Sequence, residues 1–130
     1  MIQLKRFEFS HITLQNEKVM ERFEYPNEID FSKWLVSGKS QIYQLYGVLV
    51  HEGGKADSGH YYVYLNIDGK WFKFNDEIVL KVHEKQVFDY NFGGSIDVVE
   101  LDTREMSVKM RQIVSSSTAY MLVYVKKDQK

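Results

Sequence analysis

The chain has 130 residues, of which 44% are hydrophobic, and its formal net charge is −1, from 17 basic and 18 acidic side chains. It is long enough for one globular domain or part of one, and the balanced charge indicates no nucleic-acid partner. No apolar run is long enough to span a membrane, so we expect no membrane partner. The absence of cysteine excludes disulfides and thiolate metal sites, and we expect no metal and no cofactor. The opening MIQLKRFEFS lacks the apolar segment of a signal peptide, so we expect a cytoplasmic or nuclear location, or both.

The first half of the chain predicts mostly strands, because the aromatic share of 15% favours extended structure. We expect strands at residues 2–9 and 18–25, the second stopped by Pro26, the only proline, with a polar turn between them. Residues 29–35 have a helical spacing of apolar side chains. Residues 43–51 form a strand whose apolar residues occur on both faces, which is typical of the centre of a sheet.

A β-hairpin is the strongest local signal in the second half. Residues 60–67 and 70–75 read as strands on either side of Asp68-Gly69, a pair typical of two-residue turns. A short strand is expected at residues 77–82, and a short helix over residues 84–91 ends at a pair of glycines.

Two further elements complete the expected fold. Residues 103–114 carry apolar side chains at helical spacing, which predicts an amphipathic helix, and residues 119–125 read as a buried final strand. We therefore expect an α+β fold, mainly an antiparallel β-sheet with one or two short helices. Residues 1–130 form a single unit, without repeats and without a linker that would divide it.

His60 begins the first strand of the hairpin, and Asn75 and Asp76 end the second. With a two-residue turn, Asn75 lies opposite Tyr62, on the face that carries His60 and one diagonal step away, at about 7 Å between backbone carbons. A three-residue turn with a bulge would shift the register by one residue and bring Asp76 beside His60 instead. The spacing alone leaves either residue as the partner of His60.

A histidine oriented by an amide or a carboxylate is the base half of a nucleophilic site. A cysteine nucleophile tolerates asparagine as the orienting residue, because a thiolate–imidazolium pair needs alignment more than a third charge. The alternative is an ordinary surface hairpin with a histidine at its edge. Spacing alone favours that alternative, because most histidines are not catalytic.

Five ordered blocks carry a resemblance to a known family: LKRFEF, YQLYGVLVHEG, SGHYYVYL, WFKFND and AYMLVYV. They resemble the C-terminal half of the catalytic domain of the ubiquitin-specific proteases, and the resemblance covers nearly the whole chain. It implies the palm-like part of a papain-like cysteine protease domain. Two stretches, ERFEYP and YNFGG, are similar to the herpesvirus-associated branch of this family.

The resemblance implies a role for three polar residues of the hairpin. His60 would be the general base, and Asn75, directly after WFKF, would orient it. Asp76 would be the neighbouring polar residue that some members also use. His11 and His83 match no functional position and are expected at the surface.

The resemblance also implies a binding channel for the C-terminal tail of ubiquitin. Residues 52–58 would form a mobile loop over the tail, and His51 at its root would line the channel. Phe7, Tyr61 and Phe92 would wall a slot that admits only the glycines of the tail. Without the resemblance, Phe7 and Phe92 are better explained as packing residues, because phenylalanine is usually buried.

The family's nucleophile lies in a cysteine box near the start of its catalytic domain, and this sequence contains no cysteine. We expect the chain to be the C-terminal portion of a deubiquitinating thiol protease that hydrolyses the bond after the C-terminal glycine of ubiquitin, and to be inactive alone. Its expected partners are the ubiquitin tail, ubiquitinated proteins and the missing N-terminal half of the same catalytic domain. The alternative is a non-catalytic ubiquitin-binding module, but retention of both His60 and Asn75 argues against it.

Overall fold

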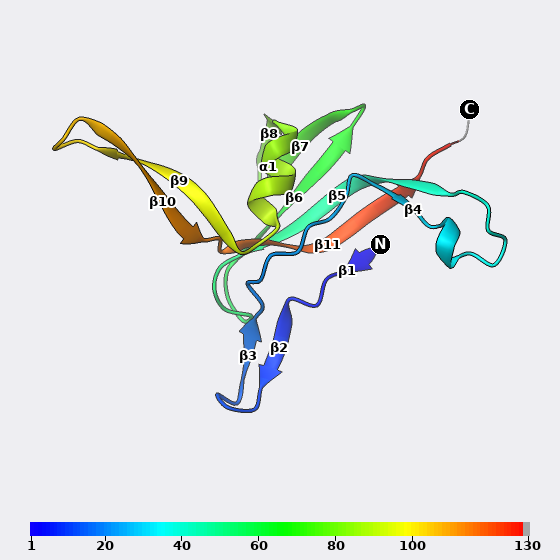
Figure 1. Cartoon of the computed structure of the whole chain (residues 1–130), viewed down its shortest axis with the longest axis horizontal. Coiled ribbons are helices and arrows are strands. Elements are labelled where there is room, and N and C mark those ends of the chain that lie inside the picture. Colours follow the sequence, from blue (N-terminus) through cyan, green and yellow to red (C-terminus); the bar gives the residue numbers. More distant parts are fainter. Residues whose placement is uncertain (129–130) are drawn as a thin grey trace.

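A computed structural model describes residues 1–128, and within them the chain forms one main antiparallel sheet and two ribbons (Figure 1). The elements are β1 (Ile2–Gln3), β2 (Phe7–Ser10), β3 (Gln15–Lys18), β4 (Glu28–Asp30), η1 (Ser32–Trp34), β5 (Ile42–Glu52), β6 (His60–Ile67), β7 (Lys70–Asn75), β8 (Ile78–Val82), α1 (Glu84–Phe88), η2 (Asp89–Asn91), β9 (Ser95–Asp102), β10 (Ser107–Val114) and β11 (Ser117–Lys126). The strand order of the main sheet is β1-β11-β5-β6-β7-β8, with β4 beside β5. The predicted α+β class with a mainly antiparallel sheet is confirmed.

The core lies between α1 and the central strands of the main sheet (Figure 1). Val48 and Val50 of β5 and Val87 of α1 are fully buried. The Tyr25 hydroxyl donates to the Val87 carbonyl at 2.7 Å, and its ring contacts the Phe92 ring at 4.8 Å between centroids. Each such buried valine stabilises the fold by about 1.5–3 kcal/mol, so α1 is held mainly by apolar contact.

The β6–β7 hairpin has the predicted two-residue turn. Asp68 and Gly69 have φ angles of 52° and 78°, and Ile67 pairs with Lys70. Positive φ at both central residues is the requirement of a type I′ turn, which aspartate followed by glycine meets at low cost. The local sequence therefore sets the register that the site depends on.

The predicted helix at residues 103–114 is wrong, because this segment forms β10, which pairs with β9 along its whole length. Asp102 Oδ1 accepts the backbone N–H of Arg104 at 2.9 Å and so starts a turn instead of a helix. The two strands form an arm that leaves the body (Figure 1), with its apolar residues alternating with charged ones. A segment whose apolar residues fit a helix can still form a strand when a partner strand supplies the backbone hydrogen bonds.

Residues 29–35 are not one helix but the end of β4 followed by the short 3₁₀ turn η1. Asp30 Oδ1 accepts the backbone N–H of Ser32 at 2.9 Å, which turns the chain there. The predicted strand over residues 2–9 is interrupted between β1 and β2. The strand predicted over residues 18–25 is also wrong except at Lys18. The observed strand β3 begins earlier, at Gln15 within the predicted turn, and ends at Lys18.

Arg6, a buried arginine, lies where the first predicted strand is interrupted and contacts the segment after Lys18, where the second predicted strand is missing. Arg6 is 3% exposed, and its guanidinium donates to four backbone carbonyls, those of Val19, Glu21, Phe92 and Ala119, at 3.2, 2.5, 2.9 and 3.3 Å. Arg6 thus joins carbonyls from three separate segments of the chain, and the Phe92 carbonyl also accepts the Phe23 N–H at 2.8 Å. Residues 19–25 therefore follow an irregular path around Arg6.

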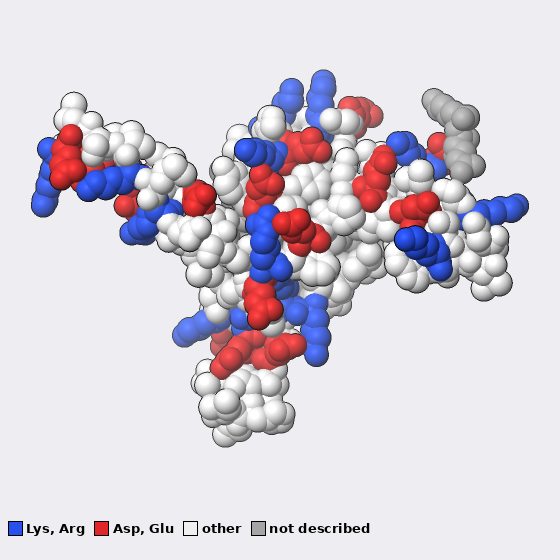
Figure 2. Space-filling view, in the orientation of Figure 1, with Lys and Arg blue, Asp and Glu red and all other residues white. Residues whose placement is uncertain are grey.

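The remaining predicted elements are confirmed: the helix over residues 84–91 as α1 and η2, the strand at residues 77–82 as β8, and the strand at residues 119–125 within β11. In the part of the chain that the structure describes, no helix is both long and apolar enough to cross a membrane. Figure 2 shows charges of both signs interspersed over the body and the arm, in keeping with the net charge of −1.

Candidate active site

His60 and Asn75 meet at the end of the β6–β7 hairpin. The observed register, in which Val63 pairs with Phe74, places Asn75 opposite Tyr62 and diagonal to His60. The His60 Nε2 atom lies 2.5 Å from Asn75 Oδ1. The register with a two-residue turn, and the predicted contact of Asn75 with His60, are therefore confirmed.

This contact determines which nitrogen of the His60 ring is free. A carboxamide oxygen only accepts hydrogen bonds, so Nε2 carries the hydrogen and donates it to Asn75. The other nitrogen, Nδ1, has no hydrogen-bond partner within residues 1–128, and the side chain is 43% exposed. The ring is thus oriented at one nitrogen and free to accept a proton at the other.

Asp76 takes a second, looser position near the same ring. Its carboxylate Oδ2 lies 3.8 Å from His60 Nε2, and its side chain is 78% exposed. Asp76 has a φ of 52° and belongs to the two-residue turn between β7 and β8, in which Asn75 pairs with Ile78. The structure therefore makes Asn75 the direct partner of His60 and Asp76 a solvated neighbour.

Three of the four predicted channel residues, Phe7, His51 and Tyr61, pack together in a ring cluster. Tyr120 also belongs to this cluster and was not predicted from the sequence. Ring centroids are 5.3 Å apart for Phe7 and His51, 4.9 Å for His51 and Tyr61, and 5.5 Å for Phe7 and Tyr120. Tyr120 lies at an irregularity in the β5–β11 pairing, which the sequence does not mark. Phe92 is not in the cluster; it is 8% exposed and packs in the core.

The ring cluster and the His60–Asn75 pair lie on opposite faces of the same end of the sheet. Glu52 pairs with His60, and His51 pairs with Tyr61, in the β5–β6 ladder. Adjacent residues of a strand point to opposite faces, so His60 and Tyr61 diverge. The 52–59 loop, which joins β5 to β6, lies at the strand ends between the two groups.

The two ends of the 52–59 loop form a tight neck, made of residues 51–53 and 58–59. His51 Nε2 donates to the Ser58 carbonyl at 2.9 Å, and the Gly53 N–H donates to the Ser116 carbonyl at 3.1 Å. Burial, chiefly, lowers the pKa of His51, which favours the neutral form of this ring. Within the loop, Lys55 makes a backbone bridge to Glu17 of β3. The neck is therefore fixed by hydrogen bonds on both sides.

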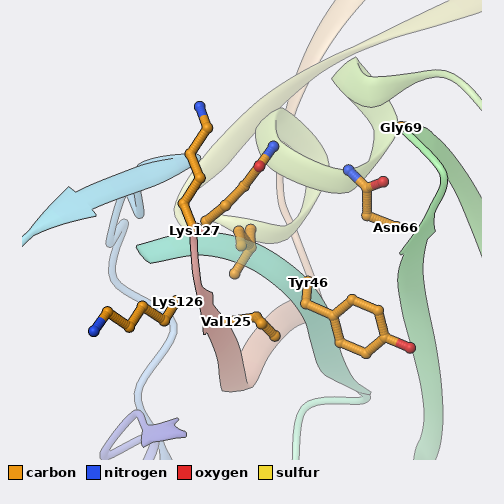
Figure 3. Close-up of a pocket in the computed structure, with 8 residues that line it drawn as sticks. Tyr46, Asn66, Gly69, Val125, Lys126 and Lys127 are labelled. Carbon is orange, nitrogen blue, oxygen red and sulfur yellow. The ribbon is translucent and has the colours of Figure 1, made fainter. Parts of the chain in front are cut away.

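A cavity lies near the Asp68-Gly69 turn, at the opposite end of the hairpin from His60 and Asn75. This cavity of about 250 Å³ is lined in part by Tyr46, Asn66, Gly69 and Val125 (Figure 3). It contains no member of the His60–Asn75 pair or the ring cluster, so we assign it no role. No group of three or more metal-ligating side chains occurs in residues 1–128.

A histidine held by an amide at one nitrogen and free at the other has the arrangement of a general base beside its orienting residue. The family model for ubiquitin carboxyl-terminal hydrolase matches residues 1–124. The chain belongs to the ubiquitin carboxyl-terminal hydrolase family.

Curated relatives support this assignment over nearly all of the chain. The chain is 37% identical to ubiquitin carboxyl-terminal hydrolase 5 of Schizosaccharomyces pombe, over 98% of this chain and 12% of the relative. It is 31% identical to ubiquitin carboxyl-terminal hydrolase 7 of Drosophila melanogaster, over 98% of this chain and 11% of the relative. The chain thus spans only about a ninth of the length of these relatives.

Solved structures show the same fold. A structure of the yeast SAGA DUB module superposes with a TM-score of 0.68 at 26% identity, covering 98% of this chain and 24% of that chain. A SAGA DUB module bound to monoubiquitin gives a TM-score of 0.67 at 25% identity, with 98% and 23% covered.

Proposed function

We propose that this chain is the part of a deubiquitinating thiol protease that supplies the general base, His60, and its orienting residue, Asn75. The observation that carries the proposal is the His60 ring itself, held at Nε2 by Asn75 and open at Nδ1. The family membership and the relative bound to monoubiquitin support ubiquitin as the proposed substrate class.

The nucleophile must come from outside these 130 residues, because they contain no cysteine. We propose that this chain is the C-terminal portion of a larger catalytic domain, and we use "complete catalytic domain" for the chain joined to its cysteine-bearing portion. The stretches ERFEYP and YNFGG support membership of the herpesvirus-associated branch.

In this mechanism the cysteine thiol passes its proton to Nδ1 of His60, and the thiolate attacks the carbonyl carbon of the last glycine of ubiquitin. The imidazolium then gives the proton to the leaving amine as the carbon–nitrogen bond breaks, which leaves a thioester. His60 next takes a proton from water, whose oxygen attacks the thioester carbon. The carbon–sulfur bond then breaks, which releases ubiquitin with a free C-terminal carboxyl group and restores the cysteine thiolate beside the imidazolium. Asn75 holds the ring in one tautomer throughout.

The ubiquitin tail would pass the strand ends beneath the 52–59 loop. The ring cluster on one face and His60 on the other both lie at that end of the sheet, so a tail in contact with both must cross between them. Phe7 and Tyr61 are proposed to contact the tail, and His51, which is only 1% exposed, is proposed to support their rings from beneath. Phe92, packed against Tyr25, would support this region from the core.

A ubiquitin-binding module without chemistry is the second candidate, and the lack of cysteine favours it. The two candidates differ in whether the contact between His60 and Asn75 matters for turnover. Binding alone does not require an oriented imidazole.

In the complete catalytic domain, we expect Asn75→Ala to lower kcat for a ubiquitin–fluorophore substrate by about 10²-fold, the cost of a misplaced catalytic group. KM should change little, because orientation matters mainly in the transition state. Asn75→Asp keeps an acceptor oxygen and should retain much of the rate. Asp76→Ala, the matched control, removes an exposed carboxylate 3.8 Å from Nε2 and should be mild. A larger loss for Asp76→Ala than for Asn75→Ala would reverse the assignment.

A further inference from the structure

Lys18 is a buried lysine held by backbone carbonyls instead of a carboxylate. It is 8% exposed, and its ammonium donates to the carbonyls of His51, Gly53 and Ser116 at 2.9, 2.8 and 2.7 Å. An ammonium has three N–H donors, so this geometry uses all of them. Among the ion pairs of residues 1–128, none involves Lys18.

The three carbonyls belong to the neck of the 52–59 loop and to the segment beside it. His51 and Gly53 flank Glu52, the residue that pairs with His60. The Ser116 carbonyl, just before β11, also accepts the Gly53 N–H at 3.1 Å. One side chain from β3 therefore joins the neck to the start of β11.

The charge of Lys18 is costly where it lies. Burial, and then the nearby Arg6, lower its pKa from 10.5 to about 8, against the opposing effect of Glu52. A groove of about 600 Å³ opens beside it, and the charged groups that line this groove with Lys18 are Glu17, Lys55 and Asp57. His51, whose carbonyl it binds, is the other titratable neighbour. A buried cation that makes no ion pair is costly, so its hydrogen bonds to the three carbonyls must offset that cost.

We propose that Lys18 is a positioning residue whose ammonium clasps the neck of the 52–59 loop and so holds that loop in place over the substrate tail. This proposal rests on the proposed function in one respect only, which is that the substrate tail is the C-terminal tail of ubiquitin. The clasp acts on substrate binding, because the His60–Asn75 contact is made within the β6–β7 hairpin and does not pass through Lys18.

The test uses the complete catalytic domain with Lys18→Met, which keeps the apolar stem and removes the ammonium. We expect KM for a ubiquitin–fluorophore substrate to rise by about tenfold or more, the loss typical of charge-assisted hydrogen bonds, with kcat nearly unchanged. The matched control is Lys5→Met, because Lys5 has a side chain that is 82% exposed. A merely structural lysine would instead lower the active fraction, and hence apparent kcat, without raising KM.

Hydrogen exchange of the Gly53 amide gives a readout that does not need activity. We expect faster exchange in Lys18→Met than in the unmodified protein, with β7 and β8 unchanged. Lys18→Gln, which keeps N–H donors but loses the charge, should also exchange faster than the unmodified protein, because a neutral amide cannot replace three charge-assisted hydrogen bonds.

The outcomes separate the clasp from the proposed function. If ubiquitin is turned over but Lys18→Met matches Lys5→Met in KM and in Gly53 exchange, the clasp is wrong and the proposed function stands. If ubiquitin is never turned over, the proposed function fails. The comparison of Gly53 exchange between Lys18→Met and the unmodified protein still shows whether Lys18 holds the neck in place. If Lys18→Met does not fold, Lys18→Gln decides it: KM and Gly53 exchange equal to those of the unmodified domain overturn the clasp.

Discussion

Replacing His60 with alanine in the complete catalytic domain should lower kcat by about 10²- to 10⁴-fold, the range for loss of a general base. The reason is the geometry of the ring. Nε2 is hydrogen-bonded to Asn75, Nδ1 is free, and within residues 1–128 no other titratable side chain makes a hydrogen bond to the Asn75 side chain. Ubiquitin binding should persist, because the proposed tail contacts come from other residues. Kinetics with a ubiquitin–fluorophore substrate and a separate binding titration check both parts.

The matched control is His11→Ala. His11 is exposed in the turn between β2 and β3, and its only described contact is with the ring of Phe9. We expect its kcat and KM to equal those of the unmodified domain. Equal activity of His60→Ala and His11→Ala would remove His60 from the mechanism.

Gly59→Ala should be the most damaging change in the 52–59 loop. Gly59 has a φ of +119°, and an added Cβ would lie 2.3 Å from the Glu52 carbonyl and 2.8 Å from His51 Nε2. Glu52 pairs with His60, so relief of the clash must move the start of β6. We expect a loss of stability of about 1–3 kcal/mol from backbone strain alone. We also expect kcat/KM to fall by about tenfold or more, because displaced catalytic groups lose rate steeply.

Gly54→Ala is the stability control, because it lies in the same loop but a Cβ there meets no atom within 4 Å. Thermal unfolding should show a change within about 0.5 kcal/mol for Gly54→Ala, as for most open surface sites. If both variants unfold at the same temperature and Gly59→Ala keeps its kcat/KM, the tight neck does not exist in solution.

The elements that the sequence predicted well are those determined by local chemistry. Asp68-Gly69 fixes the hairpin turn, and that turn fixes the register that joins His60 to Asn75. From the spacing alone, either Asn75 or Asp76 could have been the partner of His60. The structure decides between them because a two-residue turn leaves Asp76 in the next turn of the chain.

The elements that were predicted wrongly depend on distant partners. Residues 107–114 have apolar side chains that fit a helix, but β9 provides a partner strand along their whole length. Arg6 was assigned to a continuous strand, yet one of its acceptors, the Ala119 carbonyl, lies 113 residues away in the sequence. No local pattern indicates that a charged residue will be buried against carbonyls from separate segments. The hydrogen bonds of Lys18 and the ring contact of Tyr120 with Phe7 also join residues that are far apart in the sequence, so the sequence did not predict them.

The central claim is that this chain holds the base half of a two-part active site. The most direct measurement is turnover of a ubiquitin–fluorophore substrate by the 130-residue chain alone, by the cysteine-bearing portion alone, and by the two combined. We expect turnover above buffer only in the combination, and only when His60 is present. Turnover by this chain alone that His60→Ala abolishes would contradict the claim, because it would require a nucleophile within the chain itself.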